Sequence, residues 1–217
     1  MVLGGARSGK STFAQRRAGE LGGEQVLFVA TAGAGDEEMR QRIEKHRRER
    51  PAGWQTLEAP QDVGRAIAAH GGTAKVVLVD CLTLLVANRL GNAEDPEDPF
   101  APDVEAAVAA EVQELAACAG RLAGHLIVVS NEVGMGLVPP YPLGRAYRDL
   151  LGQANQALAQ KADEVYLLIA GIPLAIKGPG SAAPPLGPPR QNGGEAVFPP
   201  ARAAQAGAGS PVLTGEG

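Results

Sequence analysis

Apolar residues along the chain gather in short, nearly continuous runs that alternate with longer stretches of helical periodicity. The runs occupy residues 25–30, 75–80 and 126–129, with two further runs at 165–170 and 174–177. Apolar runs of this length are typical of strands that are covered on both faces in a parallel sheet. We therefore predict a strand for each run, and a helix for most of the stretches between them.

The helical pattern is plainest in residues 103–122, where apolar side chains recur at spacings of three or four, at Val104, Val108, Val112, Leu115, Ala119 and Leu122. Residues 11–21, 82–90 and 143–162 are also predicted to be helical. A further predicted helix at 36–48 has only Met39 and Ile43 as an apolar stripe, so it should lie on the surface. Strands that alternate with helices predict an α/β fold: a mainly parallel sheet with helices on both faces.

The composition changes after residue 177. The chain has 217 residues, of which 45% are hydrophobic, enough for one sizeable core. Residues 178–217 are instead rich in Gly, Pro and Ala and poor in large apolar side chains, so they cannot bury enough surface to offset the entropy lost on ordering. We predict a single domain over 1–177 and a disordered C-terminal tail over 178–217.

Charge, hydropathy and cysteine content indicate which classes of protein and which cellular compartment fit the chain. A net charge of −4 and a pI near 5.5 argue against a general nucleic-acid binder, whose footprint would be basic. No apolar run reaches the length of a membrane span, and no secretion leader opens the chain. Cys81 and Cys118 lack the spacing of a metal site or a disulfide framework, and are expected to be buried thiols. These features predict a cytoplasmic protein.

The first candidate for chemistry is a phosphate-binding loop. Residues 4–11 read Gly4, Gly5, Ala6, Arg7, Ser8, Gly9, Lys10 and Ser11, which matches the pattern G-x-x-x-x-G-K-S. In such a loop backbone N–H groups surround the phosphates, the lysine reaches the β- and γ-phosphates, and the serine hydroxyl binds Mg²⁺. Only Met1, Val2 and Leu3 precede it, fewer than the usual five or six residues of a strand, so either the first strand is a stub or the natural start lies further upstream.

Polar residues follow the other predicted strands. Asp80 ends the strand at 75–80, as in a Walker-B segment whose carboxylate supports Mg²⁺, although an Asp there could instead cap the next helix. We favour the metal role, because open α/β sheets bind ligands at the carboxyl ends of their strands. Residues 130–136, Ser-Asn-Glu-Val-Gly-Met-Gly, occupy the same place after another strand and could line a ligand site or form an ordinary loop.

His46 has two interpretations. It shares a helical face with Met39 and Ile43 and lies in a basic stretch. Spacing favours a partly exposed histidine beside a solvated run of charges. The alternative is a nucleophile whose neighbouring cations hold phosphate, and spacing cannot choose between the two.

Several motifs together are more specific than any one of them. Beside residues 4–11 they are Ala-Thr at 30–31, Arg-Ile-x-x-His at 42–46, Arg-Pro-x-x-Trp at 50–54 with Glu58, Asp-Cys-Leu-Thr at 80–83, Ser-Asn-Glu-Val-Gly-Met-Gly at 130–136, and Arg-Asp-x-x-Gly-x-x-Asn-Gln at 148–156. In this combination the chain resembles the bifunctional adenosylcobinamide kinase/adenosylcobinamide-phosphate guanylyltransferases of cobalamin biosynthesis. The resemblance covers residues 1 to about 177.

The resemblance implies two reactions: phosphorylation of adenosylcobinamide with ATP or GTP, then transfer of GMP from GTP to the product, adenosylcobinamide phosphate. It assigns His46 as the carrier of a covalent GMP, which reverses the interpretation from spacing alone, with Lys10 and Asp80 as further catalytic residues. It places Ser11 and Asp80 at Mg²⁺ and implies a homotrimer. Besides residues 4–11, the implied nucleotide site comprises Thr31, Ala32, Gly33, Arg47, Arg48, Glu49, Arg50, Glu58 and Asp80.

The residues by themselves leave two rivals open. The first is a small-molecule P-loop kinase without guanylyl transfer, in which His46 is an ordinary surface residue. The second is a nucleotide-dependent interaction switch that modifies no metabolite. Residues 130–136 and the polar face of the helix at 143–162 favour a substrate pocket over a switch.

Overall fold

The structure is a computed structural model, and it describes residues 1–33, 50–91, 99–179 and 181. Its seven-stranded sheet has the order β3-β2-β4-β5-β1-β6-β7. Six strands are parallel and β7 is antiparallel to β6. The strands are β1 (Val2–Gly4), β2 (Val26–Ala30), β3 (Gln55–Glu58), β4 (Val76–Asp80), β5 (His125–Asn131), β6 (Val165–Ile169) and β7 (Ile172–Lys177). The predicted mainly parallel sheet is confirmed.

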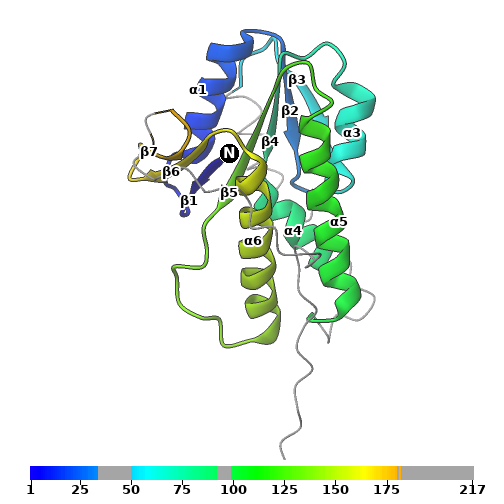
Figure 1. The fold of residues 1–217 in the computed structure, drawn as a ribbon, viewed down its shortest axis with the longest axis vertical. Coiled ribbons are helices and arrows are strands. Elements are labelled where there is room, and N and C mark those ends of the chain that lie inside the picture. The colour runs from blue at the N-terminus through cyan, green and yellow to red at the C-terminus, as the bar shows by residue number, and fades with distance from the viewer. Residues whose placement is uncertain (34–49, 92–98, 180, 182–217) are drawn as a thin grey trace, which may run out of the picture.

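Helices cover both faces of this sheet, as predicted (Figure 1). Alternation along the strands makes this possible: in β4, Val76 and Leu78 pack with α1, whereas Val77 and Val79 pack with the helices of the opposite face. One face carries α1 (Lys10–Gly22), and the other carries α3 (Val63–His70), α4 (Leu82–Gly91), α5 (Pro102–Ala119) and α6 (Pro142–Lys161). The predicted helix at 36–48 and most of the tail lie outside the described residues.

The short first strand lies inside the sheet. β1 has three residues, as the sequence indicated, and pairs in parallel with β5 on one side and with β6 on the other. Val2 and Leu3 are buried between these neighbours. The loop that follows β1 therefore starts from within the sheet, with strands on both sides to hold it.

Two elements were not predicted. β3 is the edge strand, and three of its four residues are exposed, so it lacks the apolar run that marks the buried strands. α3 has eight residues and follows Pro60 and Gln61. Asp62 is a residue type favoured at the start of a helix, but its backbone is left-handed and its side chain makes no capping hydrogen bond.

Two smaller predictions can be compared with the structure. None of the helices in the described part of the chain is both long and apolar enough to cross a membrane. Both cysteines are free thiols; Cys118 is buried as expected, but Cys81 is only half-buried.

Candidate active site

The predicted phosphate-binding loop joins β1 to α1, where such a loop is expected. Gly9 has φ 87°, a left-handed conformation that strains any residue with a Cβ. Lys10 and Ser11 then form the first turn of α1, whose N–H groups and dipole favour a bound anion.

Contacts with β6 and with the turn that follows it hold this loop in place. A Cβ on Gly4 would lie 2.4 Å from Ser8 Oγ and 2.8 Å from the carbonyl oxygen of Leu168 in β6. Gly171, in the turn after β6, donates its N–H to the carbonyl of Ser8 at 3.0 Å. Gly4 is therefore needed for close packing, and the loop is supported by strands far away in the sequence.

Lys10 and Asp80 act on the same neighbour, the thiol of Cys81. Burial raises the pKa of the Cys81 thiol, the Asp80 carboxylate raises that pKa further, and the Lys10 ammonium lowers it. Charges of opposite sign, one from the phosphate-binding loop and one from the end of β4, therefore both influence the Cys81 thiol. Asp80 and the Ser11 hydroxyl offer the oxygen ligands that Mg²⁺ prefers, and Mg²⁺ commonly takes few ligands from a protein. Among the described residues, no group of three His, Cys, Asp or Glu side chains could hold a metal by itself.

Thr31 ties β2 to β4 at the carboxyl edge, the edge of the sheet where the parallel strands end. Its buried hydroxyl donates to the carbonyl of Cys81 and accepts the N–H of Cys81, both at 2.7 Å. The side chain of Thr31 thus fixes the connection after Asp80. Its assignment to the nucleotide site stays a prediction, as do those of Ala32 and Gly33.

The connection after β5 is fastened to the phosphate-binding loop and to α6. Glu132 donates its N–H to the carbonyl of Gly4 at 3.1 Å, so this connection lies directly beside the loop. Asn155 in α6 donates from Nδ2 to the carbonyl of Asn131 at 3.0 Å, and Arg148 donates to the carbonyl of Gly134.

A further bond joins this connection to α4, because Asn131 donates its N–H to Thr83 Oγ1 at 2.8 Å. Four motifs that are far apart in the sequence, those at 4–11, 80–83, 130–136 and 148–156, therefore meet at the carboxyl edge.

Arg50 and Glu58 are the remaining described residues of the implied nucleotide site. The Arg50 guanidinium lies over the ring of Phe28, 3.4 Å from its centroid, and donates to Thr56 Oγ1 at 3.4 Å. Phe28 and Thr56 are paired across β2 and β3, so Arg50 is attached to both strands. Glu58 is the exposed last residue of β3. His46, Arg47, Arg48 and Glu49 lie outside the described residues.

Tyr147 is a residue of this region that the sequence analysis did not single out. Its hydroxyl donates to the carbonyl of Thr83 at 3.4 Å. Burial, and then the nearby Cys81 thiol, raise the pKa of Tyr147 to about 12. In the sequence Tyr147 is one more apolar position of α6, so no local signal distinguishes it.

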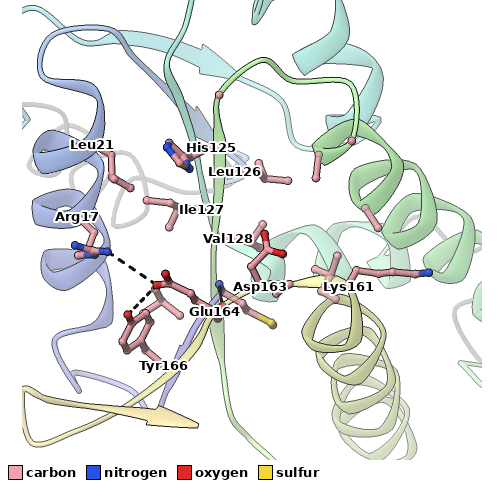
Figure 2. A pocket seen from close by; sticks show the side chains of 18 of the residues that line it. Arg17, Leu21, His125, Leu126, Ile127, Val128, Lys161, Asp163, Glu164 and Tyr166 are labelled. Carbon is pink, nitrogen blue, oxygen red and sulfur yellow. Dashed lines mark hydrogen bonds and ion pairs between the residues drawn. The ribbon is translucent and has the colours of Figure 1, made fainter. Parts of the chain in front are cut away.

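A pocket of about 530 Å³ lies at the amino ends of the parallel strands, opposite the carboxyl edge (Figure 2). It is lined by the starts of β5 and β6 and by the C-terminal turns of α1 and α6. Beside it Tyr166 donates to Glu164 at 2.8 Å, and Arg17 pairs with the same carboxylate at 3.9 Å. The parallel strands begin there, so this pocket is separate from the phosphate-binding loop.

Comparisons with known proteins agree with the motifs. The model of the family "cobinamide kinase / cobinamide phosphate guanyltransferase" (CobU) matches residues 1–176. The bifunctional adenosylcobalamin biosynthesis protein CobU of Escherichia coli K12 is 43% identical over 180 residues, which cover 82% of this chain and 98% of that protein. CobP of Pseudomonas aeruginosa, with the same description, is 42% identical over 178 residues, covering 82% of this chain and 96% of that protein.

A third relative and one solved structure are also similar to this chain. CobU of Salmonella typhimurium is 41% identical over 180 residues, again covering 82% of this chain and 98% of that protein. A solved structure, the flagellar accessory protein FlaH of Methanocaldococcus jannaschii, is 14% identical with a TM-score of 0.42, covering 82% of this chain and 76% of that one, a likeness too slight to carry an argument. The family model and the three relatives, each matched over nearly its whole length, lead to one conclusion: the chain belongs to the cobinamide kinase/cobinamide phosphate guanyltransferase family and is a transferase.

Proposed function

We propose that the protein phosphorylates adenosylcobinamide with ATP or GTP and then transfers GMP from GTP to adenosylcobinamide phosphate, giving adenosylcobinamide-GDP and pyrophosphate. The observation that carries this proposal is the convergence of the four family motifs at the carboxyl edge, where hydrogen bonds join them to one another. Family membership supplies the two reactions, and the relatives' description as bifunctional cobalamin biosynthesis proteins supports both.

For the kinase step, the phosphate-binding loop would present the γ-phosphate to the substrate alcohol. Lys10, the first-turn N–H groups of α1 and Mg²⁺ on Ser11 and Asp80 would neutralise the charge that develops on the transferred phosphoryl group. Mg²⁺ would supply Lewis-acid stabilisation of the phosphate oxygens when bound.

For the guanylyl transfer, His46 is the proposed nucleophile. A neutral imidazole nitrogen would attack the α-phosphorus of GTP, forming a phosphoramidate bond and releasing pyrophosphate as the α–β phosphoanhydride bond breaks. The phosphate of adenosylcobinamide phosphate would then attack the same phosphorus and free the histidine. Arg47, Arg48 and Arg50 are the proposed cations that hold the phosphates, because guanidinium groups bind phosphate oxygens in pairs.

The assembly is part of the proposal: three identical subunits, as the family resemblance implies. Support comes from the antiparallel hairpin of β6 and β7 at one edge of the sheet, where four large aliphatic side chains are exposed, at Ile169, Ile172, Leu174 and Ile176. Exposed apolar side chains gathered on an edge strand mark surfaces that associate with other chains. Light scattering during size-exclusion chromatography would show a mass three times that of the chain; a monomer would contradict this part.

Covalent labelling tests the guanylyl transfer. Incubation with GTP labelled on the α-phosphate, followed by denaturation, is expected to leave an acid-labile label on the protein. The chain has three histidines, and this allows matched controls: His46→Ala should abolish the label, whereas His70→Ala and His125→Ala should retain it. His70 is exposed on α3, and His125 lines the pocket at the opposite edge.

An unlabelled wild type would contradict the guanylyl transfer and leave the kinase-only reading. The kinase step is tested separately with γ-labelled nucleotide and adenosylcobinamide, where label should appear on the corrinoid. Absence of transfer in both experiments would favour the nucleotide-dependent interaction switch.

A further inference from the structure

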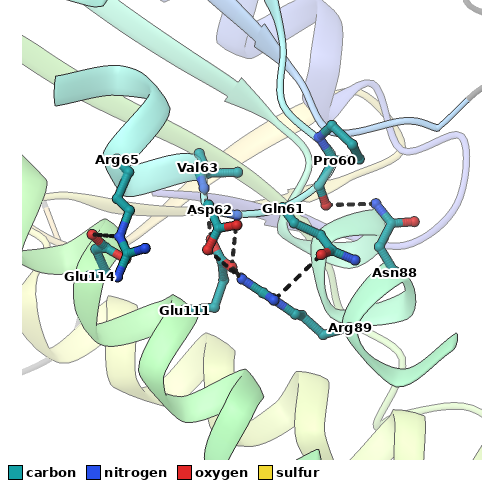
Figure 3. Close-up of polar contacts among 9 residues, drawn as sticks. All are labelled: Pro60, Gln61, Asp62, Val63, Arg65, Asn88, Arg89, Glu111 and Glu114. Atoms are coloured by element: carbon teal, nitrogen blue, oxygen red, sulfur yellow. Dashed lines mark hydrogen bonds and ion pairs between the residues drawn. The ribbon is translucent and has the colours of Figure 1, made fainter. Parts of the chain in front are cut away.

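Asn88 in α4 joins the carboxyl ends of two neighbouring strands. Its Nδ2 donates to the carbonyl of Thr31 at 2.8 Å and to the carbonyl of Pro60 at 2.9 Å. Thr31 directly follows β2, and Pro60 lies two residues after β3. Figure 3 shows the bond to Pro60. One amide nitrogen therefore links the connections that leave β2 and β3.

Only a side-chain amide suits this position well. Both partners are carbonyl acceptors, so the nitrogen must face them, and its two hydrogens are both used. An aspartate would place a carboxylate oxygen against two carbonyl oxygens. An apolar residue of similar size would leave the two carbonyls without this donor, one of them at the fully buried Thr31.

The next residue of α4 fixes the same connection from a second direction. Arg89 donates from Nε to Glu111 at 2.8 Å and from Nη2 to Asp62 at 2.9 Å (Figure 3). The buried Glu111 carboxylate also accepts the N–H of Asp62 at 3.0 Å and that of Val63 at 2.8 Å. The start of α3 is thus bound to α4 and α5. Because Pro60 lies two residues before Asp62, its carbonyl is held in position to accept the hydrogen bond from Asn88.

Both connections flank residues of the implied nucleotide site. Thr31 opens the segment that continues through Ala32 and Gly33, and Glu58 ends β3 two residues before Pro60. Ala59 donates its N–H to the carbonyl of Ala30 at 2.9 Å, which holds the two connections together at the level of the strands. Past the ends of the two strands, the pair of hydrogen bonds from Asn88 joins the connection after β2 to the connection after β3.

We propose that Asn88 is a positioning residue for nucleotide binding: it sets the spacing between residues 31–33 and 58–60 without contacting the nucleotide. This inference rests on the proposed function, which assigns these two segments to the nucleotide site. It adds a residue to which the sequence motifs and the family resemblance gave no role.

Hydrogen exchange of the full-length protein tests the bridge itself. In Asn88→Ala and Asn88→Asp, the N–H groups of Thr31 and Ala59 should exchange faster, because the strand ends that they join open more often. Arg65→Ala is the matched control: it removes the exposed pair with Glu114 between α3 and α5, seen in Figure 3, and leaves both connections untouched. Unchanged exchange in both Asn88 variants would overturn the proposal.

Nucleotide binding tests the positioning role. The dissociation constant of GTP, measured by calorimetry well below the melting temperature, should rise about tenfold in Asn88→Ala and more in Asn88→Asp. The KM for GTP should rise with it while kcat stays within about twofold. A residue that served stability alone would lower the melting temperature and leave the dissociation constant unchanged.

The two proposals fail in different ways. A wild type that binds GTP but transfers neither phosphate nor GMP contradicts the proposed function, and the effect of Asn88 on binding can still be measured. Asn88 variants that bind GTP like the wild type, even with faster exchange at Thr31 and Ala59, contradict the positioning role and leave the proposed function standing.

Discussion

Lys10 turns back over the loop that precedes it, and its Nζ donates to the carbonyl of Gly5 at 3.2 Å. The Lys10 ammonium is therefore held over the loop in which we propose that a phosphate binds. An entering phosphate oxygen would compete with a neutral carbonyl for this ammonium, and a charged acceptor forms the stronger hydrogen bond.

Lys10→Met is expected to lower kcat for both transfers by about 10²- to 10³-fold, because a donor to the developing charge is lost. Rates with γ-labelled and α-labelled GTP measure the two steps separately. Lys161→Met removes the same charge beside the pocket at the opposite edge of the sheet, and its rates should match those of the wild type. Equal rates in Lys10→Met and Lys161→Met would contradict the role of Lys10.

Gly4→Ala is expected to lower the free energy of unfolding by about 1–3 kcal/mol, because the new methyl group meets Ser8 and a backbone oxygen of β6. Gly5→Ala, where the added Cβ has nothing within 4 Å, is the control for stability and should unfold like the wild type. Denaturant titration of both variants gives the comparison. If Gly4→Ala were as stable as Gly5→Ala, the loop would have moved to accommodate the methyl group without lowering the free energy of unfolding, and the prediction would be wrong.

Glu111→Ala is expected to lower the free energy of unfolding by about 3–5 kcal/mol, since it leaves Arg89 and two backbone N–H groups without their shared acceptor. Glu114→Ala removes a more exposed carboxylate from the same helix and should cost about 0–1 kcal/mol. Thermal unfolding followed by circular dichroism would separate these outcomes, and similar losses in the two variants would refute the special role of Glu111.

Tyr147 predicts a loss of stability in alkali. Its pKa is about 12 in the folded protein and 10 in the unfolded chain. Between these values the unfolded state gives up the phenolic proton and the folded state keeps it, so the free energy of unfolding falls as pH rises from 10 to 12. Tyr147→Phe should weaken this fall, and the component of highest pKa should vanish from the phenolate absorbance titration. A titration curve unchanged by the substitution would contradict the prediction.

The parts of the fold that the sequence predicted are those whose signal is local. Helices cover both faces of β2 and β4, so both strands are apolar on both faces. Each therefore appears in the sequence as a continuous apolar run. β3 is a polar edge strand, and α3 begins without a local cap. The groups that hold both elements lie far along the chain, and the local signs of α3, Asp62 followed by Val63 and Ile67, span little more than one helical turn.

The candidate site shows the same division. The residues at 4–11 and Asp80 follow from motif and position alone. Asn88 and Tyr147 do not, because their roles depend on carbonyl groups 57 and 64 positions away, at Thr31 and Thr83. A single asparagine or tyrosine in a helix offers no periodicity or spacing that would indicate such a partner.

The carboxylate of Glu111 has a consequence for the order in which the chain folds. α3 has eight residues, too few for a stable isolated helix, and its first N–H groups find their acceptor 48 positions later, in α5. Until α5 docks, these two backbone N–H groups lack their carboxylate acceptor, and among the described contacts the start of α3 keeps that of Asp62 with Arg89 in α4. We expect α3 to form late, so that destabilising substitutions within it speed unfolding and leave the folding rate nearly unchanged.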